Sequence, residues 1–214
     1  MPIVSNYGTL KTEMTADLFH PRLAARYDSA INRFEAAANT RLRVRQMETK
    51  AFLQTDIAGN VRLPDDYLLW RAVLQDNTTT SGGTEAELNY VHPAYLKSTV
   101  QVRAPAPGIF TIEGPELIVR PIDTAAVYIV HYYGKIPTIV TPALDNEADN
   151  WLIVEYPNAY IYGVLCELAG MQRNVEMAQL YKARRDEAFA EITQLSALTT
   201  DPAAAPQQRT ADYF

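Results

Sequence analysis

Apolar residues between positions 15 and 42 recur at steps of three and four along the chain. They are Leu23, Tyr27, Ala30, Ile31, Phe34, Ala38 and Leu42. This spacing places their side chains on one face of an α-helix. We therefore predict an amphipathic helix over residues 15–42, with Thr15 or Asp17 capping an early turn and Pro21 at a first-turn position.

The pattern changes between residues 46 and 140 to short runs of β-branched and aromatic residues divided by turn residues. Gly59 lies between two such runs, and the Gly114-Pro115 pair divides the clearest hairpin, IFTIE and ELIVR. The run VYIVHYYG ends at Gly134 and predicts a further strand. We expect about five or six short strands, enough for a small sheet or barrel.

Two shorter segments belong to the same middle part of the chain. The sequence LNYVHPAYLKST predicts a short strand and then a short helix that starts near Pro93. The polar residues 76–87 include Gly82 and Gly83 and predict a flexible loop. The middle part is therefore predicted to be a β-rich lobe with one long loop.

The most apolar part of the chain is NWLIVEYPNAYIYGVLCELAGM, at residues 150–171. Asp149 or Asn150 is a suitable N-cap for a short helical turn at the start of this run. Pro157 suits the first turn of a second, longer helix. We therefore predict two helical pieces with a break between residues 155 and 158.

This apolar run is not expected to cross a membrane. A spanning helix needs roughly 20 consecutive apolar residues, whereas Glu155, Pro157 and Glu167 interrupt the run. We predict instead the central core helix of the protein, in which the small residues Gly163 and Ala169 allow close packing against the neighbouring helices.

A last helix is predicted from residue 174 to residue 198. Its inward stripe consists of Ala178, Tyr181, Arg185, Ala188, Ile192 and Leu195, of which Arg185 is the charged member. Residues 199–214, TTDPAAAPQQRTADYF, contain two prolines and few large apolar residues before the final Tyr213 and Phe214. This composition predicts an extended C-terminal tail.

The order of these elements predicts an α+β fold. The N- and C-terminal helices, in residues 15–45 and 149–198, are expected to form a helical bundle. Residues 46–140 are expected to form a central β-rich lobe, and residues 199–214 an extended tail. We expect residues 1–198 to be a single domain.

Composition narrows the classes of function. The chain has 214 residues, of which 48% are hydrophobic and 21% charged, and its net charge is -6. These values are typical of a globular protein with a sizeable core, and the acidic balance is unfavourable for wrapping nucleic acid. Cys166 is the only cysteine, which excludes an internal disulfide. The first residues lack a basic and then apolar pattern, so we expect no signal peptide.

No motif of catalysis or metal binding is recognisable in the sequence. His20, His92 and His131 lie in three different parts of the chain, without metal-ligand spacing. Cys166 lies in an apolar helix and is expected to be an inert core thiol. The acidic pairs Asp65-Asp66 and Glu85/Glu87 lack any sign of a shared cleft. We therefore expect no enzyme, no metal and no cofactor.

The segment RLRVRQMETK contains three arginines at alternate positions, Arg41, Arg43 and Arg45. They would share one face of a strand, but would spread around a helix. A strip that binds nucleic acid is one interpretation. Contact with acidic groups of the same chain or of a neighbour is favoured, because nothing else extends a basic patch and no aromatic residues alternate with the arginines.

Four stretches together carry a resemblance to a known family. They are AARYDSAINRFEAAANTRLRVRQME, VRLPDDYLLWR, VYIVHYYGKIPTI and NWLIVEYPNAYIYGVLCELAGM, in that order. In this order the chain resembles the head-tail adaptor, or head-completion, proteins of short-tailed bacteriophages. The resemblance covers about residues 17–198 and leaves out the loop at 76–87 and the tail.

The resemblance implies a structural protein of the virion. Such proteins assemble as a homo-oligomeric ring of twelve subunits under the portal and connect the capsid to the tail. The implied partners are the portal protein above, a tail or nozzle protein below, and double-stranded DNA that passes through the lumen without sequence recognition. The implied location is the head-tail interface of the virion, and the host cytoplasm during assembly, with no membrane anchor.

The tail supplies the remaining candidate contacts. Extended, its residues reach about 50 Å at roughly 3.3 Å each. We expect contacts to the portal or to a neighbouring subunit from Pro202, Pro206, Arg209, Tyr213 and Phe214, with the two aromatic residues as anchors. The alternative is a tail without fixed structure.

Overall fold

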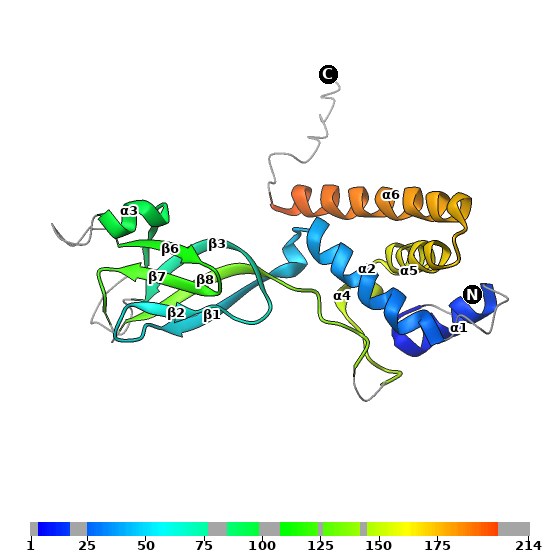
Figure 1. The fold of residues 1–214 in the computed structure, drawn as a ribbon, viewed down its shortest axis with the longest axis horizontal. Coiled ribbons are helices and arrows are strands. Elements are labelled where there is room, and N and C mark those ends of the chain that lie inside the picture. The colour runs from blue at the N-terminus through cyan, green and yellow to red at the C-terminus, as the bar shows by residue number, and fades with distance from the viewer. Residues whose placement is uncertain are drawn as a thin grey trace, which may run out of the picture. The chain divides into compact units, whose positions relative to one another are not determined.

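A computed structural model of the chain describes residues 4–17, 25–76, 85–98, 108–123, 126–141 and 145–200. The chain divides into two compact units. One combines Met1–Gln46 with Ile136–Phe214, and the other is Met47–Lys135. Among the described residues, the long helices belong to the first, which is called the helical unit, and the strands belong to the second, which is called the β unit (Figure 1). The predicted α+β class is confirmed.

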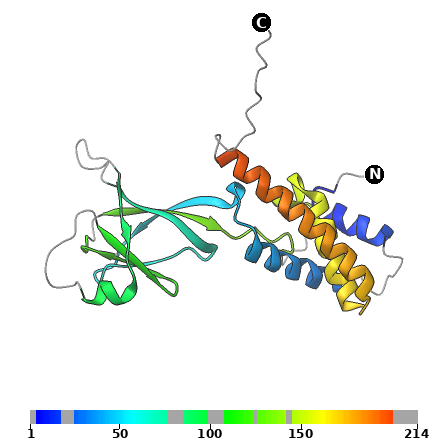
Figure 2. The ribbon, with the colours of Figure 1, turned by 90° about the horizontal axis from the view of Figure 1, so that it is seen from above.

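The helical unit is built around one central helix, α5. Its helices are α1 (Tyr7–Asp17), α2 (Tyr27–Arg41), α4 (Trp151–Glu155), α5 (Pro157–Met171) and α6 (Val175–Thr200). Helix α5 contacts each of the other four, and α6 runs alongside it in both views (Figures 1 and 2). The apolar run at residues 150–171 therefore forms the core of this unit, as predicted.

The prediction of one helix over residues 15–42 is wrong at its start. Residues 15–17 end a separate helix, α1, whose own buried stripe is Tyr7, Leu10 and Met14. The Thr15 hydroxyl donates to the Lys11 carbonyl at 2.7 Å, so Thr15 lies inside α1 and does not cap a following helix. The long helix begins at Tyr27. Pro21 lies outside the described residues.

The break in the apolar run is confirmed. The Asn150 side chain accepts from the backbone N–H of Ile153 at 3.0 Å and caps α4. Tyr156 then leaves the helical region, with φ -132° and ψ 60°, and Pro157 occupies the first turn of α5. Since proline has no N–H to donate, it is tolerated where helical hydrogen bonds have not yet begun.

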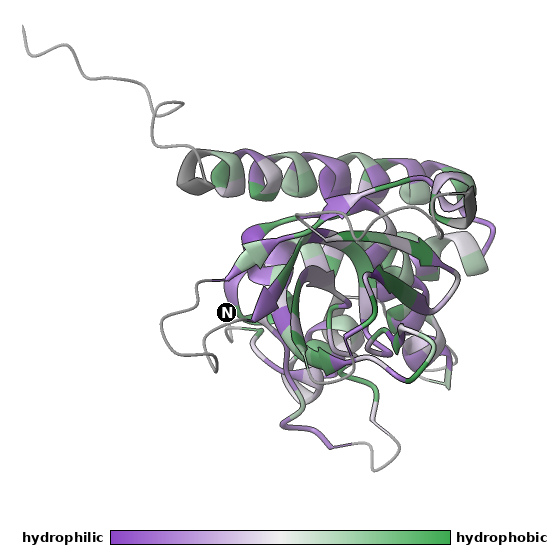
Figure 3. Ribbon diagram, turned by 90° about the vertical axis from the view of Figure 1, so that its left-hand side faces the viewer, coloured by the Kyte–Doolittle hydropathy of each residue, from purple (hydrophilic) through white to green (hydrophobic). Residues whose placement is uncertain are grey.

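Helix α6 begins where the sequence predicted it, directly after Asn174. Arg185 and Ile192 are buried as expected, but Leu195 is 43% exposed, and Phe189, which was not in the predicted stripe, is buried. Hydrophilic and hydrophobic residues alternate along the visible side of α6 in Figure 3, so its apolar stripe is less regular than predicted.

The β unit consists of two four-stranded sheets. Sheet A has the order β1 (Glu48–Gln54), β8 (Val127–Gly134), β3 (Tyr67–Asp76), β4 (Ala86–Glu87); sheet B has the order β2 (Asn60–Arg62), β7 (Glu116–Arg120), β6 (Ile109–Glu113), β5 (Asn89–Tyr90). A short helix, α3 (Pro93–Ser98), follows β5, as predicted, and a 3-10 helix at Arg45–Met47 precedes β1. The described residues thus contain more strands than the sequence indicated, because β4 and β5 have only two residues each.

Both sheets contribute to one core. It contains Val73, Tyr128 and Val130 of sheet A and Phe110 and Leu117 of sheet B. The predicted hairpin is confirmed as β6–β7, and Gly114 at its turn has φ 60°, a region that favours glycine. The predicted loop at 76–87 is too long at both ends, because Asp76 is the last residue of β3 and β4 pairs with β3. Residues 77–84 lie outside the described ranges.

Candidate interaction surfaces

The arginine segment forms neither a strand nor a continuous helix. Arg41 is the last residue of α2, Arg43 lies in the connection that follows, and Arg45 begins the 3-10 helix. Arg41 Nη1 lies 2.5 Å from Asp186 Oδ1 on α6. The favoured interpretation, contact with an acidic group of the same chain, is therefore confirmed for Arg41.

Asp186 is shared between two arginines. Its Oδ1 also accepts from Arg185, at 2.9 Å from Nη2 and 3.0 Å from Nε, and Arg185 is buried. Partial burial alone raises the pKa of the Asp186 carboxyl, but the hydrogen bonds and charges of Arg185 and Arg41 outweigh it and hold that pKa below its usual value. The cluster thus stays ionised and ties α2 to α6.

The other two arginines have different roles. Arg43 Nη1 donates to the carbonyls of Asn39, at 2.6 Å, and Leu42, at 2.5 Å, and so satisfies groups at the C-terminal end of α2. The backbone N–H of Arg45 donates to Ser196 Oγ at 2.9 Å, while its side chain is exposed. Because the three guanidinium groups face different surroundings, they do not form one basic strip.

A buried carboxylate on α2 holds the segment that returns from the β unit. Glu35, 5% exposed, accepts from the Ile139 N–H at 3.0 Å and from the Tyr160 hydroxyl at 2.5 Å. One turn later, Asn39 Oδ1 accepts from the Ile136 N–H at 2.7 Å. Burial, and next the charge of Glu35, raises the pKa of Tyr160 well above its usual value. These contacts satisfy the backbone of the returning segment.

We call these contacts of Glu35 and Asn39 with the returning segment the clamp. Sequence reasoning did not predict it. One signal was present, since Glu35 directly follows the predicted core residue Phe34 and so lies close to the apolar stripe of α2. Asn150 adds to the clamp, because its Nδ2 donates to the Pro137 carbonyl at 2.8 Å. A carboxylate beside an apolar stripe is buried only where hydrogen-bond donors meet it, and those donors lie more than a hundred residues along the chain.

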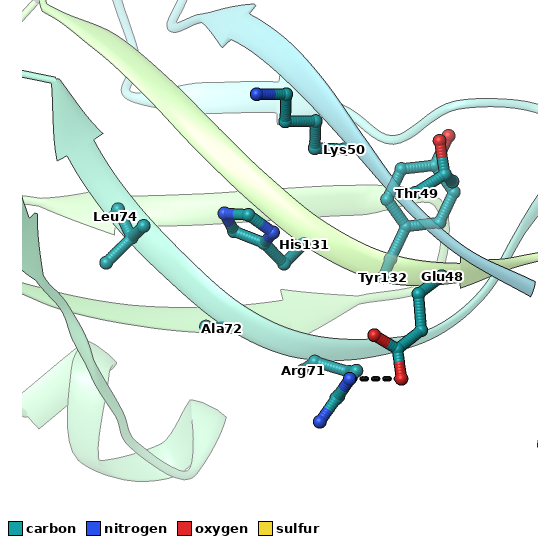
Figure 4. A pocket seen from close by; sticks show the side chains of 8 residues that line it. All are labelled: Glu48, Thr49, Lys50, Arg71, Ala72, Leu74, His131 and Tyr132. Atoms are coloured by element: carbon teal, nitrogen blue, oxygen red, sulfur yellow. Dashed lines mark ion pairs between the residues drawn. The ribbon is translucent and has the colours of Figure 1, made fainter. Parts of the chain in front are cut away.

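The outward face of sheet A carries charged, apolar and aromatic side chains beside one another. Pairing places Lys50, His131 and Ala72 in one row across β1, β8 and β3, and Phe52, Ile129 and Leu74 in the next. A hollow of about 620 Å³ opens on this face. Its lining consists of Glu48, Thr49, Lys50, Arg71, Ala72, Leu74, His131 and Tyr132 (Figure 4).

The charges around this hollow are unequally paired. Arg71 forms an ion pair with Glu48 and lies over the Tyr133 ring, 5.6 Å from its centroid. The Lys50 ammonium lies 5.3 Å from the centroid of the Phe52 ring, and the structure gives it no carboxylate among the residues it describes. Phe52 itself is 58% exposed. The hollow is therefore weakly basic with an apolar border.

The residues considered for catalysis or metal binding are not brought together. Within the described ranges, no three His, Cys, Asp or Glu side chains are placed to hold a metal ion. Asp65 pairs with Arg62, whereas Asp66 accepts from the Tyr132 hydroxyl. Cys166 is only partly buried, so it is not the core thiol that the sequence predicted. Its thiol donates to the Ala178 carbonyl at 3.5 Å, and partial burial raises its pKa, which disfavours the reactive thiolate.

No helix within the described residues has the length and apolar character that a membrane crossing requires.

The candidate contacts of the tail, Pro202, Pro206, Arg209, Tyr213 and Phe214, lie outside the described residues. His20 lies outside them as well.

Comparison with known proteins agrees with the resemblance seen in the sequence. The sequence model of the SU10 adaptor protein family matches residues 5–210, which is nearly the whole chain. A search of curated proteins finds no match. The match extends over both the helical unit and the β unit. The chain therefore belongs to the SU10 adaptor protein family and is a structural adaptor protein of a bacteriophage.

Proposed function

We propose that this phage adaptor is a head-tail adaptor. In this proposal, twelve copies form a ring that docks under the portal, connects the capsid to the tail and lines the channel for the genome. The observation that carries the proposal is the family match over residues 5–210. The order of the four resembling stretches, which is that of the adaptors of short-tailed phages, supports the finer assignment.

The surface of the helical unit is suited to contacts between subunits. Val175, Leu180 and Leu195 of α6 and Val154 of α4 are all exposed large hydrophobic residues. Each of these side chains leaves apolar surface in water that a subunit contact can bury. The helical unit therefore supplies apolar positions that a ring contact would bury.

A phage structural adaptor acts in the virion, together with other virion proteins. We propose the portal as the partner above and a tail or nozzle protein below, with assembly in the host cytoplasm. Double-stranded DNA would pass through the ring. The net charge of -6 is consistent with this, since an acidic protein does not hold phosphates tightly.

Imaging tests the proposal directly. Purified portal rings are mixed with this protein and viewed by negative-stain electron microscopy, with portal alone as the control. We expect an added ring of density at one end of the portal, and a mass that corresponds to twelve further chains. A protein that never joins the portal at concentrations sufficient for assembly contradicts the proposal.

The alternative, a nucleic-acid-binding module based on Arg41, Arg43 and Arg45, has less support. Arg41 is paired with Asp186, and Arg43 is used at the end of α2. Arg45, with its exposed side chain, is the better candidate for a charged contact with another subunit. A salt-dependent DNA mobility shift that disappears in the triple alanine variant would favour the alternative.

A further inference from the structure

The β unit carries an exposed isoleucine at the turn between β1 and β2. Ile57 is 91% exposed, and Ile122, close to the same turn, is 44% exposed. Full exposure of a large aliphatic side chain leaves apolar surface in water. We call Asp56, Ile57 and Ile122 the tip.

The turn holds Ile57 in a defined position. Asp56 Oδ1 accepts from the backbone N–H groups of Ala58, at 2.9 Å, and Asn60, at 2.8 Å. Arg120 Nη1 donates to the Ala58 carbonyl at 3.2 Å from below the turn. The tip is therefore a preorganised projection, and little conformational entropy is lost when it is buried against a partner.

The hollow on the outward face of sheet A is complementary to the tip in shape and charge. The register of β3 shifts between Trp70 and Ala72, so that Arg71 and Ala72 both line the hollow. Ala72 fills little space there, and Leu74 supplies an apolar wall (Figure 4). Lys50 supplies a positive charge that forms no ion pair among the described residues, since the nearby Glu48 is paired with Arg71. An aliphatic side chain next to a carboxylate fits this hollow.

The tip has that combination, because Ile57 directly follows Asp56, whose second carboxylate oxygen, Oδ2, has no hydrogen bond among the described residues. A tip cannot reach the hollow of its own chain. From Lys50, strand β1 continues for four residues to its end at Gln54, about 13 Å, and Ile57 lies three residues further on, in the turn. The pairing of β1 with β8 keeps this stretch extended. A tip that enters the hollow therefore has to come from a second copy.

We propose that the tip of one copy inserts Ile57 into the hollow of a neighbouring copy, with Asp56 facing Lys50. This contact is heterologous, since two different surfaces meet, and heterologous contacts generate rings when the rotation closes. The proposal rests on the proposed ring and names a contact within it. It is one part of the interface, because a stable subunit contact requires more area than a single side chain provides.

Substitutions at the tip provide the first test. Ile57 is exposed in the single chain, so Ile57→Asp should leave the thermal unfolding of the free protein unchanged. In the ring, the apolar contact with Leu74 and Ala72 is lost, and a second carboxylate beside Asp56 has to be desolvated in its place. We expect subunit association, measured by analytical ultracentrifugation with and without portal, to weaken about tenfold or more. Ile57→Leu keeps the apolar volume and should assemble normally.

A disulfide provides the second test and identifies the contact itself. Ile57→Cys and Ala72→Cys are introduced into a full chain that also carries Cys166→Ala. Under mild oxidation, the assembled protein should give a ladder of cross-linked chains on a non-reducing gel. Each single cysteine variant, oxidised in the same way, should remain monomeric on that gel.

The outcomes separate this contact from the ring proposal. The contact is overturned if Ile57→Asp forms normal rings. It is also overturned if the double cysteine variant forms rings that do not cross-link. Either result leaves the ring proposal intact. A wild-type protein that forms no ring, with or without portal, overturns both.

Discussion

At the scale of single residues, Gly163 decides how closely two helices of the core approach. A Cβ atom added at Gly163 would lie 2.1 Å from ring atoms of Phe34 on α2. The Phe34 ring also meets Tyr160 edge-on, with centroids 4.8 Å apart. A hydrogen at position 163 therefore leaves room for the aromatic pair that joins α2 to α5.

Gly163→Ala should destabilise the helical unit by about 1–3 kcal/mol, because the added methyl group has to displace the Phe34 ring. Gly170→Ala is the matched control on the same helix, since a Cβ there has no atom within 4 Å. It should stabilise by up to about 1 kcal/mol through helix propensity. Urea unfolding, followed by circular dichroism at 222 nm, measures both, and equal effects of the two changes would contradict the close-contact explanation.

Tyr132 makes the β unit sensitive to alkaline pH. Burial, and then its hydrogen bond to Asp66, raises the pKa of Tyr132 from 10.0 to about 12. Between these values the folded protein holds a proton that the unfolded chain releases, so the free energy of unfolding falls as pH rises. Stability should therefore decline between pH about 10 and about 12.

Tyr132→Phe should reduce the slope of unfolding free energy against pH in this alkaline range, because the phenol that titrates is removed. Below pH 9 its slope should match that of the wild-type protein, which serves as the internal control. Denaturant unfolding at a series of pH values measures the slope. A variant as sensitive to alkali as the wild type would show that Tyr132 does not contribute. In the variant, the free energy of unfolding should still fall somewhat with rising pH, since burial also raises the pKa of Tyr67, Tyr128 and Tyr160.

At the scale of elements, two asparagines begin two helices in different surroundings. Asn150 caps α4 and also donates to the Pro137 carbonyl, and it is buried. Asn174 caps α6 through a bond of 3.2 Å from the Met177 N–H and is exposed. The same residue type thus has one local role at α6 and an additional tertiary role at α4.

Asn150→Ala should cost about 2–3 kcal/mol, because both the cap and the bond to Pro137 are lost in a buried place. Asn174→Ala, which removes only an exposed cap, should cost about 1 kcal/mol. Chemical unfolding of the two variants gives the difference. If Asn174→Ala proved the more harmful, the tertiary role of Asn150 would be refuted.

At the scale of the whole molecule, the β unit is an insertion in the helical unit. The chain leaves the helical unit after Gln46 and re-enters it at Ile136. The re-entering segment is fixed at once by Glu35, Asn39 and Asn150. The helical unit can therefore keep its packing although its two parts are separated in sequence by a complete β unit.

Removal of residues 202–214 should weaken attachment to the portal and leave thermal unfolding of the free protein unchanged. The reason is that aromatic anchors contribute strongly to interfaces, while the buried core of the described residues lies within residues 4–192. Co-sedimentation with portal rings measures attachment, and Tyr213→Ala/Phe214→Ala tests the anchors alone. Full attachment of the truncated chain would exclude the tail as a contact.

The sequence by itself determined the kinds of element and several of their limits. The cap at Asn150, the first-turn Pro157, the turn at Gly114 and the start of α6 after Asn174 could all be predicted. Each depends on the conformational preference or hydrogen bonding of residues within a few positions. The same local reasoning failed at Thr15, which lies inside α1, because the apolar spacing of Tyr7, Leu10 and Met14 was not interpreted as a separate helix.

Only the tertiary structure decided which distant residues meet. It placed β1 and β2 in different sheets although a short turn joins them, and it paired Arg41 with Asp186, 145 positions away. It also buried Glu35 and left a hollow at Ala72. These contacts depend on packing between segments far apart in the chain. No local period or propensity encodes that packing, so the surfaces with which this adaptor is proposed to assemble had to be found in the fold.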